Sequence, residues 1–314
     1  MKLDIIVPTH NSSSALLSCV SSLLGNPSLQ AINHQIIVSD DGSAPAHIQS
    51  LETNLPPQAF LVRSDSNTGA AGTRNRGVNA GNGDFILLID DDCKLDPRSN
   101  IDAMVKMGLS GFELVFGALR APGSDFFATY FNKVQIRRTR QYENSIFCGG
   151  TTALAMISRP MFDHIGGFDG EFRNYGFEDR DFIQRALDQG TKAGYCPKVI
   201  AEHEMQPSIK LITDKMYRAG RHTSAIFAHR HPAAYSKSTY AQIDPRLNNW
   251  ATLLAKAYGS RTYTSVLSIL EWCVNLRLAP RGSLRLLTRC MQAIAYAAGC
   301  KEADSPLPSA SVSK

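Results

Sequence analysis

The segment D-F-I-L-L-I-D-D-D, residues 84–92, joins a run of apolar residues to three consecutive carboxylates. Its apolar part, Asp84–Ile89, is nearly continuous, which is typical of a strand covered on both faces of a parallel sheet. Upstream, Leu3–Val7, Gln35–Ser39 and Phe60–Val62 also read as short strands, and helical patterns alternate with them. The sequence therefore predicts an α/β fold with a Rossmann-like, mixed but mostly parallel sheet and flanking helices.

Composition restricts the class of protein. Of the 314 residues, 43% are hydrophobic, which is enough to bury a sizeable core. The seven cysteines are scattered and include no C-x-x-C pair, which argues against a disulfide framework or a thiolate zinc site and for a reducing compartment. The N-terminal apolar run is too short for a secretion signal, and no stretch reaches the roughly 18 apolar residues of a membrane span. We expect a cytoplasmic protein.

The C-terminal third has a different character. Beyond Pro207 the pattern is wholly helical, and residues 205–301 hold 14 Lys or Arg against 3 acidic residues. Such a surface suits anionic lipid, a diphosphate or nucleic acid, although a solvated helical face is an equally simple interpretation. We expect a basic helical extension over 207–300 and a disordered, Ser- and Pro-rich tail over 301–314.

The three carboxylates Asp90, Asp91 and Asp92 repel one another, so we expect a cation to neutralise them. Mg²⁺ and Mn²⁺ prefer such oxygen ligands and also bind substrate phosphates. If the segment is extended, Asp90 and Asp92 point into one cleft and Asp91 points away. His203 follows a strand predicted at Gly194–Ala201 and is a candidate second ligand. A solvated acidic turn is the alternative.

Two further polar clusters follow predicted strands. In S-D-D-G-S, residues 39–43, an aspartate on the buried side can accept from a base N–H or a ribose hydroxyl, and Gly42 permits a tight turn. In S-N-T-G-A-A-G-T-R-N-R-G, residues 66–77, Gly69 lets the backbone approach a ligand, the helix N-terminus favours anions, and Arg74 suits diphosphate oxygens. Neither G-K-[ST] nor G-x-G-x-x-G is present, so the P-loop and Rossmann dinucleotide motifs are excluded.

The last cluster is G-G-F-D-G-E-F-R-N-Y-G-F-E-D-R-D-F, residues 166–182. Glu178 and Asp179 open a helix predicted over Glu178–Gln189. A carboxylate beside an acceptor hydroxyl is what a direct displacement needs as general base. Neighbouring helical residues face about 100° apart, so one acid would transfer the proton and the other would hold the acceptor. The helix dipole alone also favours acids here, which is the structural alternative.

Together these motifs resemble the inverting family 2 glycosyltransferases of the GT-A fold, from V-P-T-H-N at Pro8 through His203. The segment G-G-F-D-G-E-F to G-F-E-D-R-D-F is similar to the acceptor region shared with the β4-galactosyltransferase-like C-terminal part. The resemblance implies a catalytic domain over 1–206. Within it, 1–120 would be the nucleotide-sugar half and 121–206 the acceptor half.

The resemblance also implies roles for individual residues, by position in the shared motifs. Glu178 would bind the acceptor and Asp179 would be the catalytic base, with Gly149 and Gly150 nearby. Asp92 and His203 would hold Mn²⁺ or Mg²⁺. The donor would be bound by seven residues: Pro8, Thr9, Asp41, Gly69, Arg74, Asp90 and Asp91.

The implied activity is metal-dependent transfer of a hexosyl or hexosaminyl group, with inversion, from a nucleotide sugar. A UDP-sugar is expected because the family uses uridine most. The acceptor would be a glycan or a lipid-linked molecule in bacterial surface polysaccharide or glycoconjugate synthesis. The Q-x-x-R-W motif of processive synthases is absent, since Q-I-R-R at Gln135–Arg138 lacks the Trp, so single transfer is favoured.

Partners follow from the same features. The basic C-terminal helices would rest peripherally on the inner face of a membrane, or form a homodimer. Nucleic acid is not expected as a partner, because the basic segment lacks interleaved aromatic residues for base stacking.

Two other function classes compete with the transferase interpretation. A sugar nucleotidyltransferase typically has a basic, glycine-rich N-terminal loop, whereas V-P-T-H-N-S-S-S contains no Lys or Arg. A non-catalytic relative would bind nucleotide or glycan only. The presence of Asp92, Glu178, Asp179 and His203 argues against it.

Overall fold

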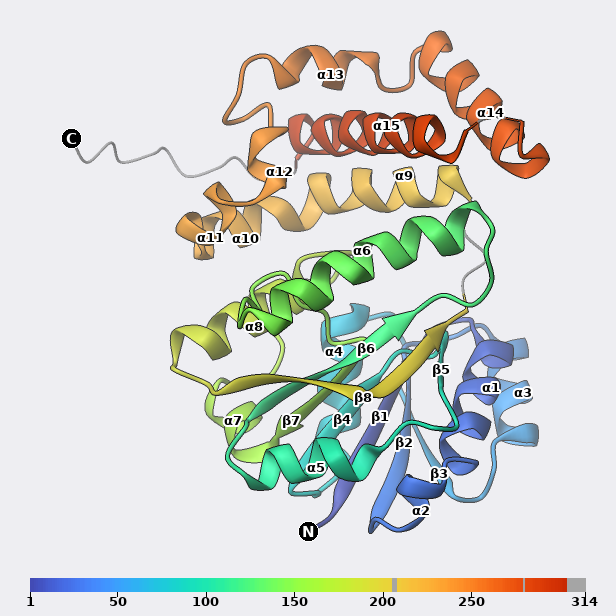
Figure 1. The fold of residues 1–314 in the computed structure, drawn as a ribbon, viewed down its shortest axis with the longest axis vertical. Coiled ribbons are helices and arrows are strands. Elements are labelled where there is room, and N and C mark those ends of the chain that lie inside the picture. The colour runs from blue at the N-terminus through green and yellow to red at the C-terminus, as the bar shows by residue number, and fades with distance from the viewer. Residues whose placement is uncertain (205–207, 279, 304–314) are drawn as a thin grey trace. The chain divides into compact units, whose positions relative to one another are not determined.

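The computed structural model describes residues 1–204, 208–278 and 280–303 (Figure 1). The chain forms two compact units. One comprises Met1–Arg173 and Asp179–Met205, and the other comprises Asn174–Glu178 and Gln206–Lys314. From residue 304 on, the tail predicted over 301–314 lies outside the described residues.

The first unit contains a mixed sheet of eight strands in the order β3-β2-β1-β4-β7-β6-β8-β5. Its strands are β1 Leu3–Thr9, β2 His34–Asp40, β3 Ala59–Arg63, β4 Phe85–Ile89, β5 Cys93–Leu95, β6 Leu114–Arg120, β7 Leu154–Ser158 and β8 Ala193–His203. The first four strands in the spatial order are parallel, whereas β7 runs antiparallel to β4 and β6. This α/β architecture with flanking and C-terminal helices confirms the predicted fold class.

Helices flank the sheet and form the second unit (Figure 1). In the first part of the chain they are α1 Ser13–Leu24, α2 Pro27–Gln30, α3 Pro45–Asn54, α4 Gly69–Asn79, α5 Ile101–Leu109, α6 Phe126–Glu143, α7 Arg159–His164 and α8 Glu178–Asp188. Those of the second unit are α9 Ile209–Arg218, the π-helix η1 Ala219–Thr223, α10 Ser224–Arg230, α11 Pro232–Ser236, α12 Thr239–Gln242, α13 Ala251–Ala257, α14 Arg261–Leu276 and α15 Arg281–Lys301.

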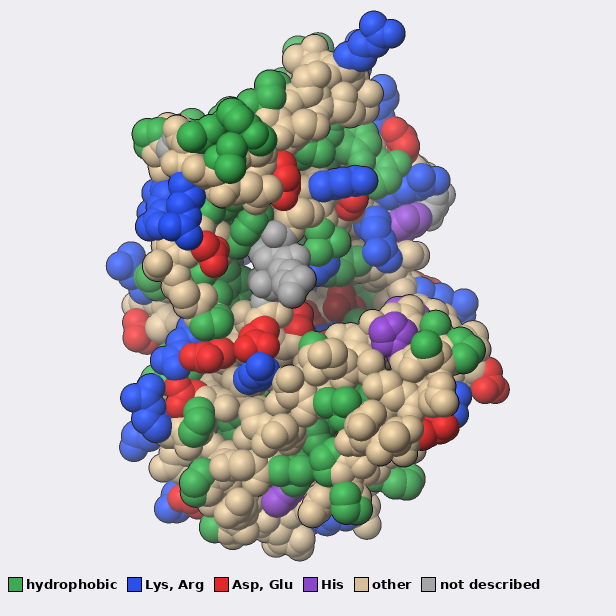
Figure 2. All heavy atoms as spheres, turned by 90° about the vertical axis from the view of Figure 1, so that its right-hand side faces the viewer, with side chains coloured by type: hydrophobic (Ala, Val, Ile, Leu, Met, Phe, Trp, Pro, Cys, Tyr) green, Lys and Arg blue, Asp and Glu red, His purple; other side chains and the backbone are tan. Residues whose placement is uncertain are grey.

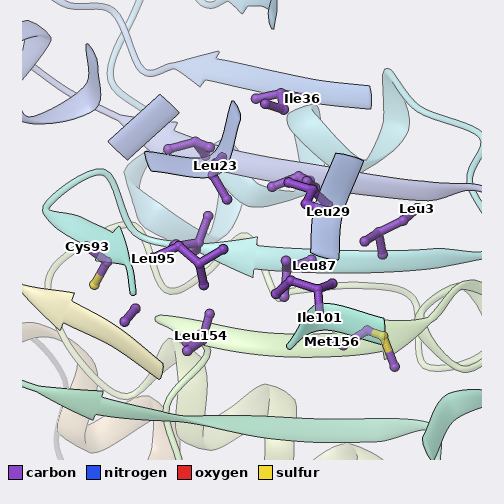
Figure 3. Close-up of a cluster of buried hydrophobic side chains, with 14 of the residues drawn as sticks. Leu3, Leu23, Leu29, Ile36, Leu87, Cys93, Leu95, Ile101, Leu154 and Met156 are labelled. Carbon is purple, nitrogen blue, oxygen red and sulfur yellow. The ribbon is translucent and has the colours of Figure 1, made fainter. Parts of the chain in front are cut away.

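Strand β1 shows why the sheet is covered on both faces. Alternate residues point to opposite faces of a strand, and Leu3, Ile5 and Val7 join the apolar core formed with α1 and α5 (Figure 3). Ile6 faces the other way, where a Cβ at Gly77 would come within 2.4 Å of its side chain. The glycine therefore lets α4 approach the sheet closely.

The topology brings the motifs to one edge of the sheet. Strand β1 lies between β2 and β4, parallel to both. The segments after these strands therefore meet at their carboxyl ends, where ligands bind in open α/β sheets. The three-residue strand β5 was not predicted. It pairs antiparallel with β8 and places Cys93 opposite His203.

The second unit is held by close helix packing and a buried polar network. A Cβ at Gly220 or Gly299 would come within 2.4 Å or 2.1 Å of a backbone carbonyl oxygen of the facing helix. Tyr235 donates a hydrogen bond to Asp244 at 2.6 Å, and their neighbour Arg246 lies 2.7 Å from the same carboxylate. All three side chains are largely shielded from solvent, so the network specifies how these helices associate.

Residues 174–178 belong to this second unit although they precede α8. Phe177 adopts a positive φ of 67° and is buried. Its ring lies 5.2 Å from the rings of Phe227 and Tyr240, measured between centroids. An unfavourable backbone conformation persists only when packing over-determines it, and the aromatic cluster supplies that packing.

Within the described ranges 1–204, 208–278 and 280–303, no helix combines the length and apolar character needed to cross a membrane.

Candidate active site

The three consecutive carboxylates after β4 each have a different partner. The predicted extended segment is wrong, because the N–H of Cys93 donates to the carbonyl of Asp90 at 3.0 Å and closes a turn. Asp90 faces Arg74, Asp91 faces Thr9, and Asp92 faces His203. The turn therefore distributes the negative charge over three directions.

Asp91 is directed toward the end of β1. The Thr9 hydroxyl donates to its Oδ2 at 2.7 Å. Burial raises the pKa of Asp91 to about 7, partly offset by hydrogen bonds from Thr9 and Ser12, while Asp92 and Asp90 raise it further. Asp91 thus joins β4 to β1 at the sheet edge. Its role in donor binding stays a prediction.

Arg74, on α4, joins two carboxylates that are distant in the sequence. Its Nη2 lies 3.0 Å from Asp90 Oδ1, and its Nη1 lies 3.2 Å from Asp179 Oδ1. Only 5% of the Arg74 side chain is exposed, and the ring of Phe168 lies 5.4 Å from its Cζ. In this arrangement the guanidinium orients carboxylates. Contact with diphosphate oxygens, predicted from the sequence, remains a prediction.

Asp179 lies at the start of α8 and accepts several hydrogen bonds. The Thr151 hydroxyl and the Thr152 N–H donate to its Oδ2 at 2.9 and 3.2 Å, and the Thr152 hydroxyl donates to its Oδ1. Burial raises the pKa of Asp179, but the Arg74 cation and the threonine hydrogen bonds outweigh it and hold the pKa below its usual range. Asp179 is therefore ionised at neutral pH.

Asp92 and His203, the two predicted metal ligands, lie close together, and their binding of a metal ion stays a prediction. Asp92 Oδ1 lies 3.3 Å from His203 Nε2, and the imidazole packs on Phe131 of α6 at 4.9 Å between ring centroids. Among the described residues, Asp92, Cys93 and His203 offer ligand atoms within 4.8 Å of one another. A carboxylate and an imidazole fit Mn²⁺ or Mg²⁺ when substrate phosphate completes the coordination.

Asp41 interacts with the N-terminus of α4. Its Oδ1 accepts from the Thr68 N–H at 2.8 Å, and its Oδ2 accepts from the Gly69 N–H at 2.9 Å. Gly69 has φ of +80°, and a Cβ there would meet the Arg173 carbonyl oxygen at 2.2 Å. Asp41 therefore caps the predicted phosphate-binding helix. Recognition of a base or ribose by Asp41 stays a prediction.

The remaining predicted residues lie at the ends of elements. Pro8 is partly exposed near the end of β1, and Glu178 is partly exposed as the first residue of α8. Gly149 and Gly150 precede Thr151, a partner of Asp179. Their predicted roles in donor or acceptor binding are not tested by the structure.

Sequence reasoning missed Thr151, Thr152, Phe131 and Cys93. The two threonines follow Gly149 and Gly150 directly and precede β7, and this position was the available signal. Cys93 follows Asp92 but belongs to no C-x-x-C pair, the pattern that indicates thiolate ligands. Phe131 carries no motif, so only the fold reveals its contact with His203.

Comparison with known proteins agrees with this geometry. A family described as Glycosyl transferase family 2 matches residues 4–166, and one described as N-terminal domain of galactosyltransferase matches residues 133–207. A Bacillus subtilis protein named uncharacterized glycosyltransferase YwdF is 30% identical over 215 residues, covering 64% of this chain and 74% of that protein. GalNAc(5)-diNAcBac-PP-undecaprenol beta-1,3-glucosyltransferase of Campylobacter jejuni is 28% identical over 119 residues, only 37% of either chain.

Solved structures share the fold. Mannosyltransferase PcManGT from Pyrobaculum calidifontis, in complex with GDP-Man and Mn²⁺, aligns with a TM-score of 0.61 at 17% identity. The alignment covers 94% of this chain and 86% of that one. Because the family match spans more than half of the chain and the motifs follow in order along the GT-A sheet, this protein belongs to glycosyl transferase family 2 and is a glycosyltransferase.

Proposed function

We propose that the protein transfers a sugar, with inversion, from a nucleoside diphosphate donor to a hydroxyl group of a glycan or lipid-linked acceptor. The observation that carries this proposal is the link from Asp90 through Arg74 to Asp179. Through Arg74, Asp90, which is predicted to contact the donor, lies close to Asp179, which is predicted to accept the proton of the acceptor hydroxyl. A single displacement needs these two functions in one site.

Asp179 is proposed as the base. Arg74 and the two threonines keep it ionised and fix its orientation, at the cost of some basicity because they lower its pKa. The acceptor hydroxyl would replace one of these hydrogen bonds when it binds, as catalytic contacts often tighten only in the complex. Glu178, next in the chain, is proposed to hold the acceptor.

Asp92 and His203 are proposed to hold Mn²⁺ or Mg²⁺. When bound, the ion supplies positive charge against the diphosphate leaving group. His203 ends β8, and Asp92 directly precedes β5, the strand paired with β8 at this point, which brings their ligand atoms close together. PcManGT was solved with GDP-Man and Mn²⁺, which supports a divalent ion but shows only a common fold.

Substrates are proposed from the relatives. Their names include a glucosyltransferase acting on an undecaprenol-linked glycan and a poly(ribitol-phosphate) beta-glucosyltransferase. We therefore propose one-step transfer in bacterial surface polysaccharide or glycoconjugate synthesis, on the cytoplasmic side of the membrane. A UDP-sugar donor is proposed separately, only because the family uses uridine most. Family membership favours this over a nucleotidyltransferase or a non-catalytic binding protein.

The test is release of nucleoside diphosphate from a panel of sugar nucleotides, with and without Mn²⁺. Wild type, Asp92→Ala, Asp179→Asn and the control Asp102→Ala are compared. Asp102 is an exposed acid on α5 that pairs with Lys106. Metal-dependent turnover by wild type and the control, lost in the two site variants, supports the proposal. Equal turnover by all four proteins, or binding of no donor by wild type, refutes it.

A further inference from the structure

Helix α14 exposes one of its apolar stripes. Ile269, Trp272 and Leu276 are 59%, 58% and 53% exposed and follow one another at intervals of three and four residues, which places them on a single face. The buried residues of the same helix, Tyr263, Leu270 and Val274, lie on the other side. The helix is thus apolar both toward its own unit and toward its surroundings.

Exposed apolar side chains are also found after α14 and on α15. Leu278, after α14, is 57% exposed, and Leu286 and Leu287 on α15 are 64% and 44% exposed. We call these residues the α14–α15 apolar face: Ile269, Trp272, Leu276, Leu278, Leu286 and Leu287. Figure 2 looks onto the side where α14 lies and shows hydrophobic side chains gathered on its upper part, with Lys and Arg beside them.

The basic residues of α15 include a row of arginines. Arg281, Arg285 and Arg289 are spaced four residues apart, so they form one stripe along α15. Across residues 251–301 the sequence contains a single acidic residue, Glu271. Its carboxylate accepts a hydrogen bond from the Ile209 N–H at 2.7 Å and is therefore directed toward α9. Helices α14 and α15 thus combine exposed apolar side chains with several cationic residues and a single acidic one.

We propose that the α14–α15 apolar face docks the protein on an anionic lipid bilayer. Apolar side chains, an exposed Trp and a row of arginines are the components of interfacial membrane binding, because the rings and leucines enter the acyl boundary while guanidinium groups stay at anionic headgroups. An anionic bilayer presents negative charge opposite the whole row of arginines, and this complementarity favours it over a protein partner here. The contact does not depend on the proposed sugar transfer.

The full chain tests this in sedimentation with vesicles of phosphatidylcholine alone or with phosphatidylglycerol added. Binding is expected only with the anionic lipid. Replacing Arg281, Arg285 and Arg289 together by Gln is expected to lower the partition coefficient by about a hundredfold, from roughly fivefold per arginine. Trp272→Gln with Leu276→Gln removes apolar contacts and is expected to lower it by at least about tenfold. Leu109→Gln, an equally exposed apolar residue on α5, is the control and should bind like wild type.

Fluorescence gives a second measurement on the same surface. In Trp250→Phe the remaining tryptophan is Trp272, whose emission should shift to shorter wavelength when anionic vesicles are added.

An unchanged emission spectrum, or equal vesicle binding by the face variants and Leu109→Gln, overturns the proposal. So does a wild-type dimer in light scattering that Trp272→Gln with Leu276→Gln abolishes, since a second copy then covers the face. Donor hydrolysis without lipid should be unchanged in the face variants, which separates this test from that of the transferase activity.

Discussion

The guanidinium of Arg74 contacts Asp179 at 3.2 Å while its second terminal nitrogen contacts Asp90 at 3.0 Å. One cation therefore contacts two carboxylates that are far apart in the sequence. Because the guanidinium is planar and rigid, it also fixes the angle between them. This relationship makes Arg74 a positioning residue whose removal should change a carboxylate pKa as well as a rate.

Replacing Arg74 by Gln should raise the pKa of Asp179, since burial would then act without the opposing cation. If Asp179 is the base, the acidic limb of the kcat/KM profile should move to higher pH by about one to three units. Wild type should show a level profile from about pH 7 to pH 5, because the pKa of its base lies below the usual Asp value of about 3.9. Initial rates over this range measure both effects.

Two variants control for this result. Arg74→Lys keeps the charge but loses the planar fork, so its limb should stay near that of wild type while kcat falls. Arg63→Gln removes an exposed arginine paired with Glu52 and should leave the profile unchanged. An acidic limb that stays in place in Arg74→Gln would assign proton transfer to another group, with Glu178 the next candidate.

Asp179 should also make stability depend on pH. Its folded-state pKa is depressed, so its contribution is complete above the unfolded value of about 3.9 and is lost as the pH falls through the folded value. Asp179→Asn should cost about 1–3 kcal/mol at neutral pH, and the difference from wild type should shrink only below about pH 4. Urea unfolding at a series of pH values measures this. A difference that already disappears between pH 7 and pH 5 is incompatible with a depressed pKa.

Asp92 and His203 should control metal affinity. Asp92→Asn or His203→Gln is expected to weaken Mn²⁺ binding by at least about a hundredfold, more than loss of an outer partner of a ligand would. Cys93→Ser should have little effect, because Mn²⁺ prefers oxygen and nitrogen ligands over sulfur. Titration calorimetry in the presence of a nucleoside diphosphate measures all three. A large loss of affinity in Cys93→Ser would instead make the thiol a ligand.

The helical unit should lose stability when its buried network is cut. Tyr235→Phe removes the hydroxyl that donates to Asp244 at 2.6 Å and lies 2.8 Å from the Tyr296 hydroxyl. Because the partner is charged and buried, the cost should be about 1.5–3 kcal/mol. The partly exposed Tyr258, whose ring stacks on Tyr217 at 4.9 Å, is the control, and Tyr258→Phe should change stability by less than about 0.5 kcal/mol. Thermal and urea unfolding distinguish the two.

The long apolar strands were predictable because their pattern is local. Phe85–Ile89 is buried throughout, as its continuous apolar run indicates. The three residues of β5 are too few for any periodicity to appear, so the pairing of Cys93 with His203 emerges only in the folded chain. The order of the motifs along the sequence resembles that of the known family, and this resemblance alone predicts that Asp92 and His203 bind the same metal ion.

The partners of the acids were less predictable than the acids themselves. The position of Asp179 at a helix start was visible in the sequence, but its hydrogen bonds with Thr151 and Thr152 depend on how β7 meets α8. Likewise, Asp91 was expected to point away from its neighbours. Its hydrogen bond with Thr9 could be predicted only if β1 and β4 were known to be adjacent and parallel.

Because Phe177 packs on Phe227 and Tyr240, residues 174–178 form one unit with the C-terminal helices although α8 follows them in the sequence. A protein truncated before residue 206 would retain Phe177 but lose Phe227 and Tyr240, the rings that bury it. Asp179 stands two residues later in the same chain segment. Exchange of the C-terminal helices between relatives, by recombination or by engineering, would therefore have to carry residues 174–178 along with them.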